Sequence, residues 1–293
     1  MDNISFGGDW TLEKLERIRK YLVAYSTIMN NYKEKFRYAY IDAFAGTGYQ
    51  LLNHDEDQNL PLFPEFVEAD SQQFLDGSAR IALQVEPRFT KYIFIEKDEK
   101  RFSSLQQLKQ DFSHLSEDII LINADANAYL TDLCLNYNWS RNRAVLFLDP
   151  FGMQVSWTTI EAIAKTGAID LWYLFPLGVA VNRLLKRDGA INEPLRERLN
   201  KLFGTNEWYE SFYQTSVTID MFGEQKRTIK VSDFGLVSKY FVERLNSVFP
   251  GVASNPLALL NSRNIPLYLL CFASGNKRGS KTAVNIAQHI LKG

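Results

Sequence analysis

The sequence predicts an α/β fold with a mostly parallel central sheet and helices on both of its faces. Three observations lead to this prediction. Short apolar strand candidates recur along the first 180 residues, helical segments separate most of them, and four of them end at small or acidic turns. This alternation is typical of right-handed βαβ units, which bring the carboxyl ends of the strands to one edge. The strand candidates are 38–41, 92–95, 119–122, 144–148 and 169–175.

Apolar periodicity predicts the helices. In 11–32, apolar residues recur at three- and four-residue steps, which indicates an amphipathic helix. Residues 53–76 combine an acidic run with two prolines and are predicted to form a surface insertion. Further helices are predicted for 77–85, 102–112, 128–135 and 158–165.

The last third of the chain is less regular. It predicts a hairpin from 215–220 and 227–231, a helix over 234–248, a buried strand over 267–273 and a final helix over 280–291. Because no flexible linker or repeat separates the parts, a single domain is expected. It consists of a leading helix (1–35), a core that carries the ligand-binding turns (36–180), and a decoration with the last sheet strand and helix (181–293).

Composition restricts the classes of function. The two cysteines, Cys134 and Cys271, have neither disulfide-framework nor metal-site spacing, so no metal is expected and a reducing cytoplasm fits best. The polar first ten residues argue against a secretory signal. The net charge of −1 divides into −8 over 1–180 and +7 over 181–293. The basic part suits a polyanion such as nucleic acid, although scattered charges are also typical of solvated helix faces.

The first turn, Asp42 to Gly48, contains Phe44, Ala45 and Gly46 and follows a strand. Its two glycines allow a tight turn and close approach to a ligand. A dinucleotide site requires a third glycine, but position 51 is Leu, and the Gly-Lys-Ser/Thr of a phosphate-cradling loop is missing. A turn with free N–H groups and an acid suits the amino-acid end of S-adenosylmethionine (SAM). A purely structural turn is the alternative.

The next two strand ends carry acids suited to a nucleoside. Glu96 ends the second strand, where a carboxylate accepts hydrogen bonds from ribose hydroxyls. Asp125 offers an acceptor for the adenine amino group, and Lys97, Ala126 and Asp149 are assigned to the same cofactor site. Helix capping is the alternative, for which Asp98 and Asn127 are the better candidates.

The fourth turn is Asp149-Pro150-Phe151-Gly152. A carboxylate or main-chain carbonyl here can accept hydrogen bonds from an exocyclic amine, and Phe151 can stack on a planar base. Methyl transfer from a sulfonium needs positioning and desolvation rather than a strong base. This agrees with the absence of a catalytic constellation around the histidines, which are His54, His114 and His289.

The order Asp-x-Phe-x-Gly-x-Gly, Glu-x-Asp, Asp, Asp-Pro-Phe-Gly resembles that of amino-methyltransferases. Nearly the whole chain resembles the three-Cys-motif partner (TcmP) family. The resemblance implies a Rossmann-like class I SAM-dependent methyltransferase fold and a partner protein with a three-cysteine motif. Departures from the family pattern are Thr47, Ala79 and Glu96. The matching residues are Trp10, Lys14, Tyr21, 42–48, 77–80, 94–96, 125–127, 148–152, 175–177, Arg183, Phe203, Gly204, Trp208, 267–268 and 272–274.

The leading hypothesis is methyl transfer from SAM to an amino nitrogen of a nucleobase in RNA or DNA. Asp42, Phe44, Gly46 and Gly48 are expected to hold the methionine end of SAM, with Lys14 reaching its carboxylate. Two alternatives are a partner subunit that binds SAM or lacks catalysis, and a nicotinamide enzyme. The residues expected to contact the substrate are Ser78, Arg80, Arg183, Lys186 and Arg187.

Overall fold

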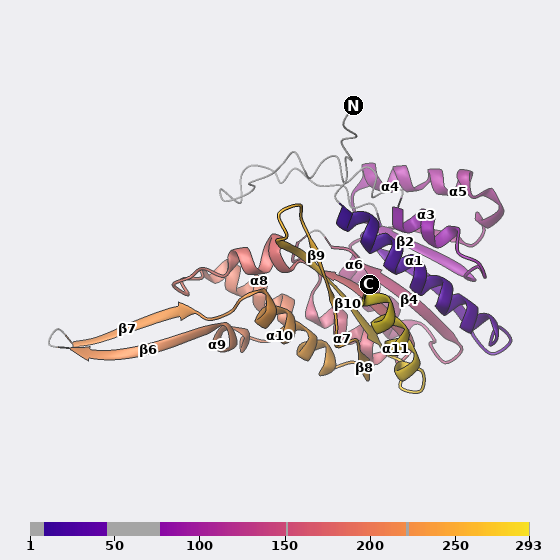
Figure 1. Cartoon of the computed structure of the whole chain (residues 1–293). Helices are drawn as coiled ribbons and strands as arrows, with labels where there is room; N and C mark the ends of the chain where they lie inside the picture. Colours follow the sequence, from indigo (N-terminus) through magenta and orange to yellow (C-terminus); the bar gives the residue numbers. More distant parts are fainter. Residues whose placement is uncertain (1–8, 46–76, 151, 221–222, 293) are drawn as a thin grey trace, which may run out of the picture.

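A computed structural model describes residues 9–45, 77–150, 152–220 and 223–292. In these residues the central sheet has the strand order β3-β2-β1-β4-β5-β10-β8, and β9 also pairs with β10. Figure 1 shows the sheet between two layers of helices. The strands are β1 (Arg37–Ala43), β2 (Lys91–Glu96), β3 (Ile119–Asn123), β4 (Asn142–Leu148), β5 (Ile169–Phe175), β8 (Gly251–Val252), β9 (Leu257–Leu260) and β10 (Pro266–Ser274).

The first five strands in the chain pair in parallel, and β10 runs antiparallel to β5. The prediction of a Rossmann-like, mostly parallel sheet is therefore confirmed. One boundary differs with consequences for the site. β1 continues to Ala43, so Asp42 lies within the strand and pairs beside Phe94 and Phe147, rather than beginning the turn.

The predicted helices are present, with shifts at their ends. The segment 102–112 was predicted as one helix, but helix formation begins at Glu99, because the Asp98 side chain caps Arg101 N. That segment then divides at Gln106, whose N–H bonds to Ser103 O three residues back. The helices up to β5 are α1 (Asp9–Asn30), α3 (Gly77–Leu83), α4 (Glu99–Leu105), α5 (Gln107–Asp111), α6 (Ala126–Asn136) and α7 (Trp157–Lys165). The insertion predicted for 53–76 lies outside the described residues.

After β5 the chain forms a π-helical segment (Leu177–Asn182), α8 (Glu193–Phe203), α9 (Trp208–Phe212), α10 (Phe234–Asn246) and α11 (Ser280–Leu291). The predicted hairpin is confirmed as β6 (Tyr213–Asp220) and β7 (Gly223–Lys230). Figure 1 shows it projecting away from the central sheet. The helix α8 was not predicted, although Asn192 caps its first turn and Gly204 ends it in the left-handed conformation.

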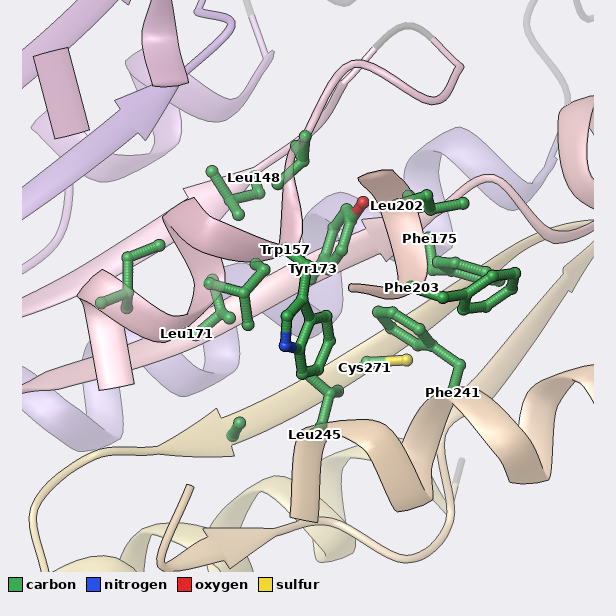
Figure 2. Packing of buried hydrophobic residues seen from close by; sticks show 14 of the residues in the cluster. Leu148, Trp157, Leu171, Tyr173, Phe175, Leu202, Phe203, Phe241, Leu245 and Cys271 are labelled. Carbon is green, nitrogen blue, oxygen red and sulfur yellow. The ribbon is translucent and has the colours of Figure 1, made fainter. Parts of the chain in front are cut away.

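Alternate side chains of the buried strands enter two separate cores. On one face Leu171, Tyr173 and Phe175 of β5 pack with α7, α8 and α10, and the Phe175 and Phe241 rings stack 3.9 Å apart (Figure 2). On the other face Trp172 and its neighbours pack under α1, α3 and α11. Since both faces of β5 are covered, its sequence is an almost continuous apolar run.

The exception in that run is Asp170, which ties three elements together at the amino end of β5. Its carboxylate accepts hydrogen bonds from Tyr21 of α1 (2.7 Å) and from Ser274 of β10 (2.5 Å). Burial raises the pKa of Asp170 to about 6, against the two hydroxyl donors and Arg143, which favour the charged form. The network fixes α1 on the sheet.

Among the described residues, no helix has the combination of length and apolar character needed to cross a bilayer.

We expect Asp170→Ala to lower the free energy of unfolding by about 2–4 kcal/mol, because it leaves two buried hydroxyls without their acceptor. The folded-state pKa lies above the unfolded value near 4, so folding takes up a proton and the contribution of Asp170 to stability falls as pH rises from about 4 to 6. The loss should therefore be larger at pH 5 than at pH 7 in urea titrations. An equal loss for the exposed control Asp188→Ala would contradict this role.

Candidate functional site

Three predicted acids lie on the same face and the same edge of the sheet. Asp42 is beside Phe94 of β2 and Phe147 of β4, and Glu96 and Asp149 each lie two residues further along those strands. All three are buried, with exposed fractions of 1%, 4% and 9%. Because β2 and β4 flank β1, their axes are about 10 Å apart. The structure thus brings the acids of residues 42, 96 and 149 to one site, as the sequence predicts.

Lys14 of α1 enters this site and pairs with Asp149. Its Nζ lies 2.7 Å from Asp149 Oδ2, and the lysine side chain is fully buried. The rings of Trp10 and Phe147 lie 5.7 and 5.6 Å from Nζ, which adds cation–π attraction. Lys14, which is predicted to reach the carboxylate of a cofactor, pairs here with the acid of the fourth turn.

Asp42 lies beside this ion pair and is the most perturbed acid of the site. Burial raises its pKa to about 7; the charge of Asp149 adds to this, while donation from Ser78 and Tyr40 and the charge of Lys14 oppose it. The Tyr40 hydroxyl is 3.1 Å from Asp42 Oδ2. Ser78 was predicted to contact the substrate, but here it donates to Asp42. Two carboxylates therefore share one buried cation.

The turn after β1 is strained at its start. Phe44 has φ of 73°, a conformation that is uncommon without glycine. The N–H of Ala45 then donates to Ile95 O at 2.9 Å, which ties the turn to β2. The predicted cofactor residues Gly46 and Gly48 lie outside the described residues.

Glu96 is held in place by the start of α4. Its Oε1 accepts from Asp98 N at 2.7 Å and from Arg101 Nη2 at 3.2 Å. The prediction that Asp98 caps this helix is confirmed. Lys97 is exposed and pairs with Asp125 at 3.4 Å. The fixed carboxylate of Glu96 is thus presented at the end of β2.

The capping assignment at α6 was wrong. Asp125, not Asn127, is the N-cap, and its Oδ1 accepts from Asn127 N and Ala128 N. A β-region backbone before the first helical residue, Ala126, puts the Asp125 side chain over these N–H groups. Burial raises the pKa of Asp125, but the helix N–H groups and Lys97 outweigh it and hold that pKa below its ordinary value.

Asn127 instead connects α6 to the chain beyond the fourth turn. Its Oδ1 accepts from Ser156 N at 2.9 Å and Thr159 Oγ1 at 2.9 Å, and its Nδ2 donates to Gln154 O at 2.8 Å. This positioning role was missed, and an Asx residue at the start of a helix gives no sequence signal that separates it from capping.

In the fourth turn, Pro150 is buried next to Asp149, and Gly152 has φ of 68°, which favours glycine. The predicted stacking residue Phe151 lies outside the described residues. Within the part of the chain that is described, no group of three or more metal-ligating side chains is placed to hold a metal ion.

The other predicted substrate residues lie on α3 and after β5. Arg80 forms an ion pair with Asp111 of α5 and lies over the Phe112 ring, so it ties α3 to α5. The remaining three are exposed and follow the π-helical segment after β5, and they are Arg183, Lys186 and Arg187.

Comparison with known proteins gives structural likenesses only. No family model and no curated protein matches the chain. Solved structures that overlap it include a spermidine synthase from Thermotoga maritima (11% identity, 92% of this chain and 60% of that one, TM-score 0.40). Others are magnesium protoporphyrin IX methyltransferase from Synechocystis PCC 6803 with bound SAM (12%, 72% and 77%, 0.31) and a conserved hypothetical protein of Streptococcus pyogenes (13%, 71% and 94%, 0.31).

We expect Lys14→Met to destabilise the fold by about 3–5 kcal/mol, because it leaves Asp149 buried without its cation. The double variant Lys14→Met/Asp149→Leu should recover most of this loss, since it removes both charges. Lys20→Met is the matched control on the same helix, because the Lys20–Glu16 pair is exposed; it should change stability by less than about 0.5 kcal/mol. Chemical denaturation measures all three. Equal effects of Lys14→Met and Lys20→Met would refute the assignment.

Asp42→Asn should change the pH dependence of stability. The folded-state pKa near 7 exceeds the unfolded value near 4, so stability from this group is present at low pH and is lost as pH rises from about 4 to 7. Removing the titration should flatten the profile and raise stability at pH 8 by about 1–3 kcal/mol. Thermal melts from pH 5 to 8 measure this, with the exposed Asp132→Asn as control. A profile parallel to that of the unsubstituted chain would count against it.

Proposed function

We propose that this chain is a SAM-dependent methyltransferase that modifies an amino nitrogen of a nucleobase in RNA or DNA. The observation that carries the proposal is the convergence of Asp42, Glu96 and Asp149 on one buried edge of a parallel sheet. Ligands of open α/β sheets bind outside the carboxyl ends of the strands. An acid at each of three neighbouring strand ends suits the ammonium of the amino-acid end, the ribose and the methyl acceptor in turn.

The methionine end of SAM would lie over β1. Asp42 would accept from its ammonium group, and the strained backbone at Phe44 would open the turn for close approach, together with Gly46 and Gly48. Lys14, whose Nζ also pairs with Asp149, would supply the positive charge for the carboxylate. A buried acid and a buried lysine in one site match a zwitterion better than they match a pyrophosphate.

The nucleoside would extend along β2 toward β3. Glu96 is suited to the ribose because its hydrogen bonds from described residues go to Oε1, and the carboxylate has two oxygens. Asp125, which is partly exposed, would accept from the adenine amino group beside Ala126 and Lys97. The carboxylates thus recognise hydroxyl and amine donors, which a nucleoside provides.

The acceptor amine would meet Asp149 and Pro150. Lys14 holds Asp149 through Oδ2, so Oδ1 and the main-chain carbonyls can orient an exocyclic amine. When bound, SAM supplies an electrophilic methyl group. These acceptors align the nitrogen lone pair with the methyl carbon, and Phe151 would stack on the base. The low exposure of the site favours displacement by excluding water.

A second candidate is a subunit that binds SAM without turnover in a complex with a three-cysteine-motif protein. Membership of the TcmP family and this partner are proposed on the sequence resemblance. The Lys14–Asp149 pair favours this candidate, because a lysine already pairs with one of the two oxygens of the carboxylate that an acceptor amine needs. Measurement of methyl transfer separates the two.

We expect SAM to bind in calorimetry, and Glu96→Gln to weaken that binding by about tenfold or more, because the ribose loses a charged acceptor. Asp149→Ala should keep SAM affinity within about tenfold but abolish transfer of labelled methyl to nucleic acid. Glu99→Gln, an exposed acid three residues after Glu96, is the matched control and should leave both unchanged.

Protection of the fold by NAD but not by SAM in a thermal-shift assay would exclude the proposal in favour of a nicotinamide enzyme. SAM binding without label transfer to nucleic acid or protein would support the non-catalytic subunit instead.

A further inference from the structure

The β6–β7 hairpin is an arm built outside the core. Its eight cross-strand pairs run from Tyr213↔Lys230 to Asp220↔Gly223, and Figure 1 shows it extending from the body of the protein. The described side chains beyond its base are almost all exposed. A two-stranded ribbon without a buried face is marginally stable in water, so its length requires an explanation other than core packing.

The base of the arm is firmly attached. The Tyr209 and Tyr213 rings stack 4.7 Å apart, and Lys230 Nζ donates to Asn182 Oδ1 at 2.6 Å. Lys230 N donates to Arg187 O at 2.9 Å. The arm therefore leaves the body in a defined direction, beside the segment that follows the carboxyl end of β5.

The two faces of the ribbon carry different chemistry. Opposed residues share a face, so the pairs Gln214↔Ile229 and Ser216↔Arg227 place Gln214, Ser216 and Arg227 on one face, together with the exposed Ile229. Gln225 joins them by the two-residue period of the strand. The other face carries Thr215 and Thr228, whose hydroxyls are 3.0 Å apart, with Lys226 and Lys230.

The first face bears the side chains that read nucleic-acid bases. Arginine pairs with guanine, glutamine pairs with adenine, and serine bonds to either base. Positive charge accompanies them: 213–231 contains three cations, Lys226, Arg227 and Lys230, against two acids, Asp220 and Glu224, near the turn. Arg183, Lys186 and Arg187 add exposed positive charge near the base of the arm, and Asp188 and Asp233, which accept from backbone N–H groups, add negative charge there.

The length and width of the ribbon favour one kind of nucleic acid over another. A strand of eight residues extends about 27 Å, or about three-quarters of a turn of B-form DNA. The major groove of B-DNA is wide enough to admit a two-stranded ribbon, whereas the major groove of A-form RNA is too narrow for side-chain readout.

We propose that the β6–β7 ribbon enters the major groove of duplex DNA with the face of Gln214, Ser216, Gln225 and Arg227 toward the bases, while the cations at its base contact phosphates. This inference rests on the proposed function and narrows its substrate to double-stranded DNA. It assigns recognition to the arm and chemistry to the edge of the sheet.

The test is fluorescence anisotropy with a pool of DNA duplexes of about 24 base pairs whose central sequence is randomised. The measurement is then repeated with the duplex that the protein selects from this pool. Arg227→Ala should weaken binding to the selected duplex by about 10- to 100-fold and relax its sequence preference. Lys226→Ala is the matched control on the opposite face. It should weaken binding to all sequences equally and reduce the salt slope by about one.

A shortened arm gives a second, independent variant. Replacing 215–228 by Asn-Gly joins the paired residues Gln214 and Ile229 through a two-residue turn. It removes no residue of the core, so melting temperature and SAM affinity should stay unchanged while DNA affinity falls more than tenfold.

Unchanged DNA binding by the shortened variant would overturn the proposal. So would binding of an RNA duplex as tight as that of the DNA duplex, or binding of a protein partner through the arm with no binding of DNA. DNA binding that depends on the arm, without SAM binding in calorimetry, would support the role of the ribbon in DNA recognition and contradict the proposal of a SAM-dependent methyltransferase. SAM binding without DNA binding would do the reverse.

Discussion

The buried ion pair between Lys14 and Asp149 is the interaction on which the rest of the site depends. It joins residues 135 positions apart, and it fixes α1 against the carboxyl edge of the sheet. Removing two charges from water costs several kcal/mol for each ion, so such a pair is weak support for stability alone. The pair lies beside Asp42, where a ligand is expected. It therefore holds the charges of Lys14 and Asp149 at a place where a ligand can contact them.

The same helix is tied to the opposite edge of the sheet. Tyr21, two turns after Lys14, donates to Asp170 at the amino end of β5. With about 1.5 Å of rise per residue, the two anchors are about 10 Å apart along α1. Polar contacts at both ends therefore set the helix in register, while the apolar side chains between them supply most of the burial. The leading helix is thus part of the site.

Patterns that repeat locally were predicted well. The strand 169–175 and the helix 280–291 agree with the structure residue for residue, because a continuous apolar run and a helical period are properties of the segment itself. The convergence of Asp42, Glu96 and Asp149 followed from parallel topology. The sequence did not predict the Lys14–Asp149 pair or the roles of Ser78, Arg80 and Asn127. These contacts depend on which side chains tertiary packing brings together.

Charge balance at this edge favours a cationic ligand. When Asp42 and Asp149 are both ionised, Lys14 compensates only one of them, and the excess negative charge contributes to the raised pKa of Asp42. A ligand ammonium beside Asp42 would supply the missing charge and draw that pKa down. Binding near pH 7 would then release a proton from the protein, since linkage makes ligand affinity and protonation two views of the same equilibrium. A buried acid whose pKa is raised to about 7 is thereby suited to bind a cation and ill suited to bind a phosphate.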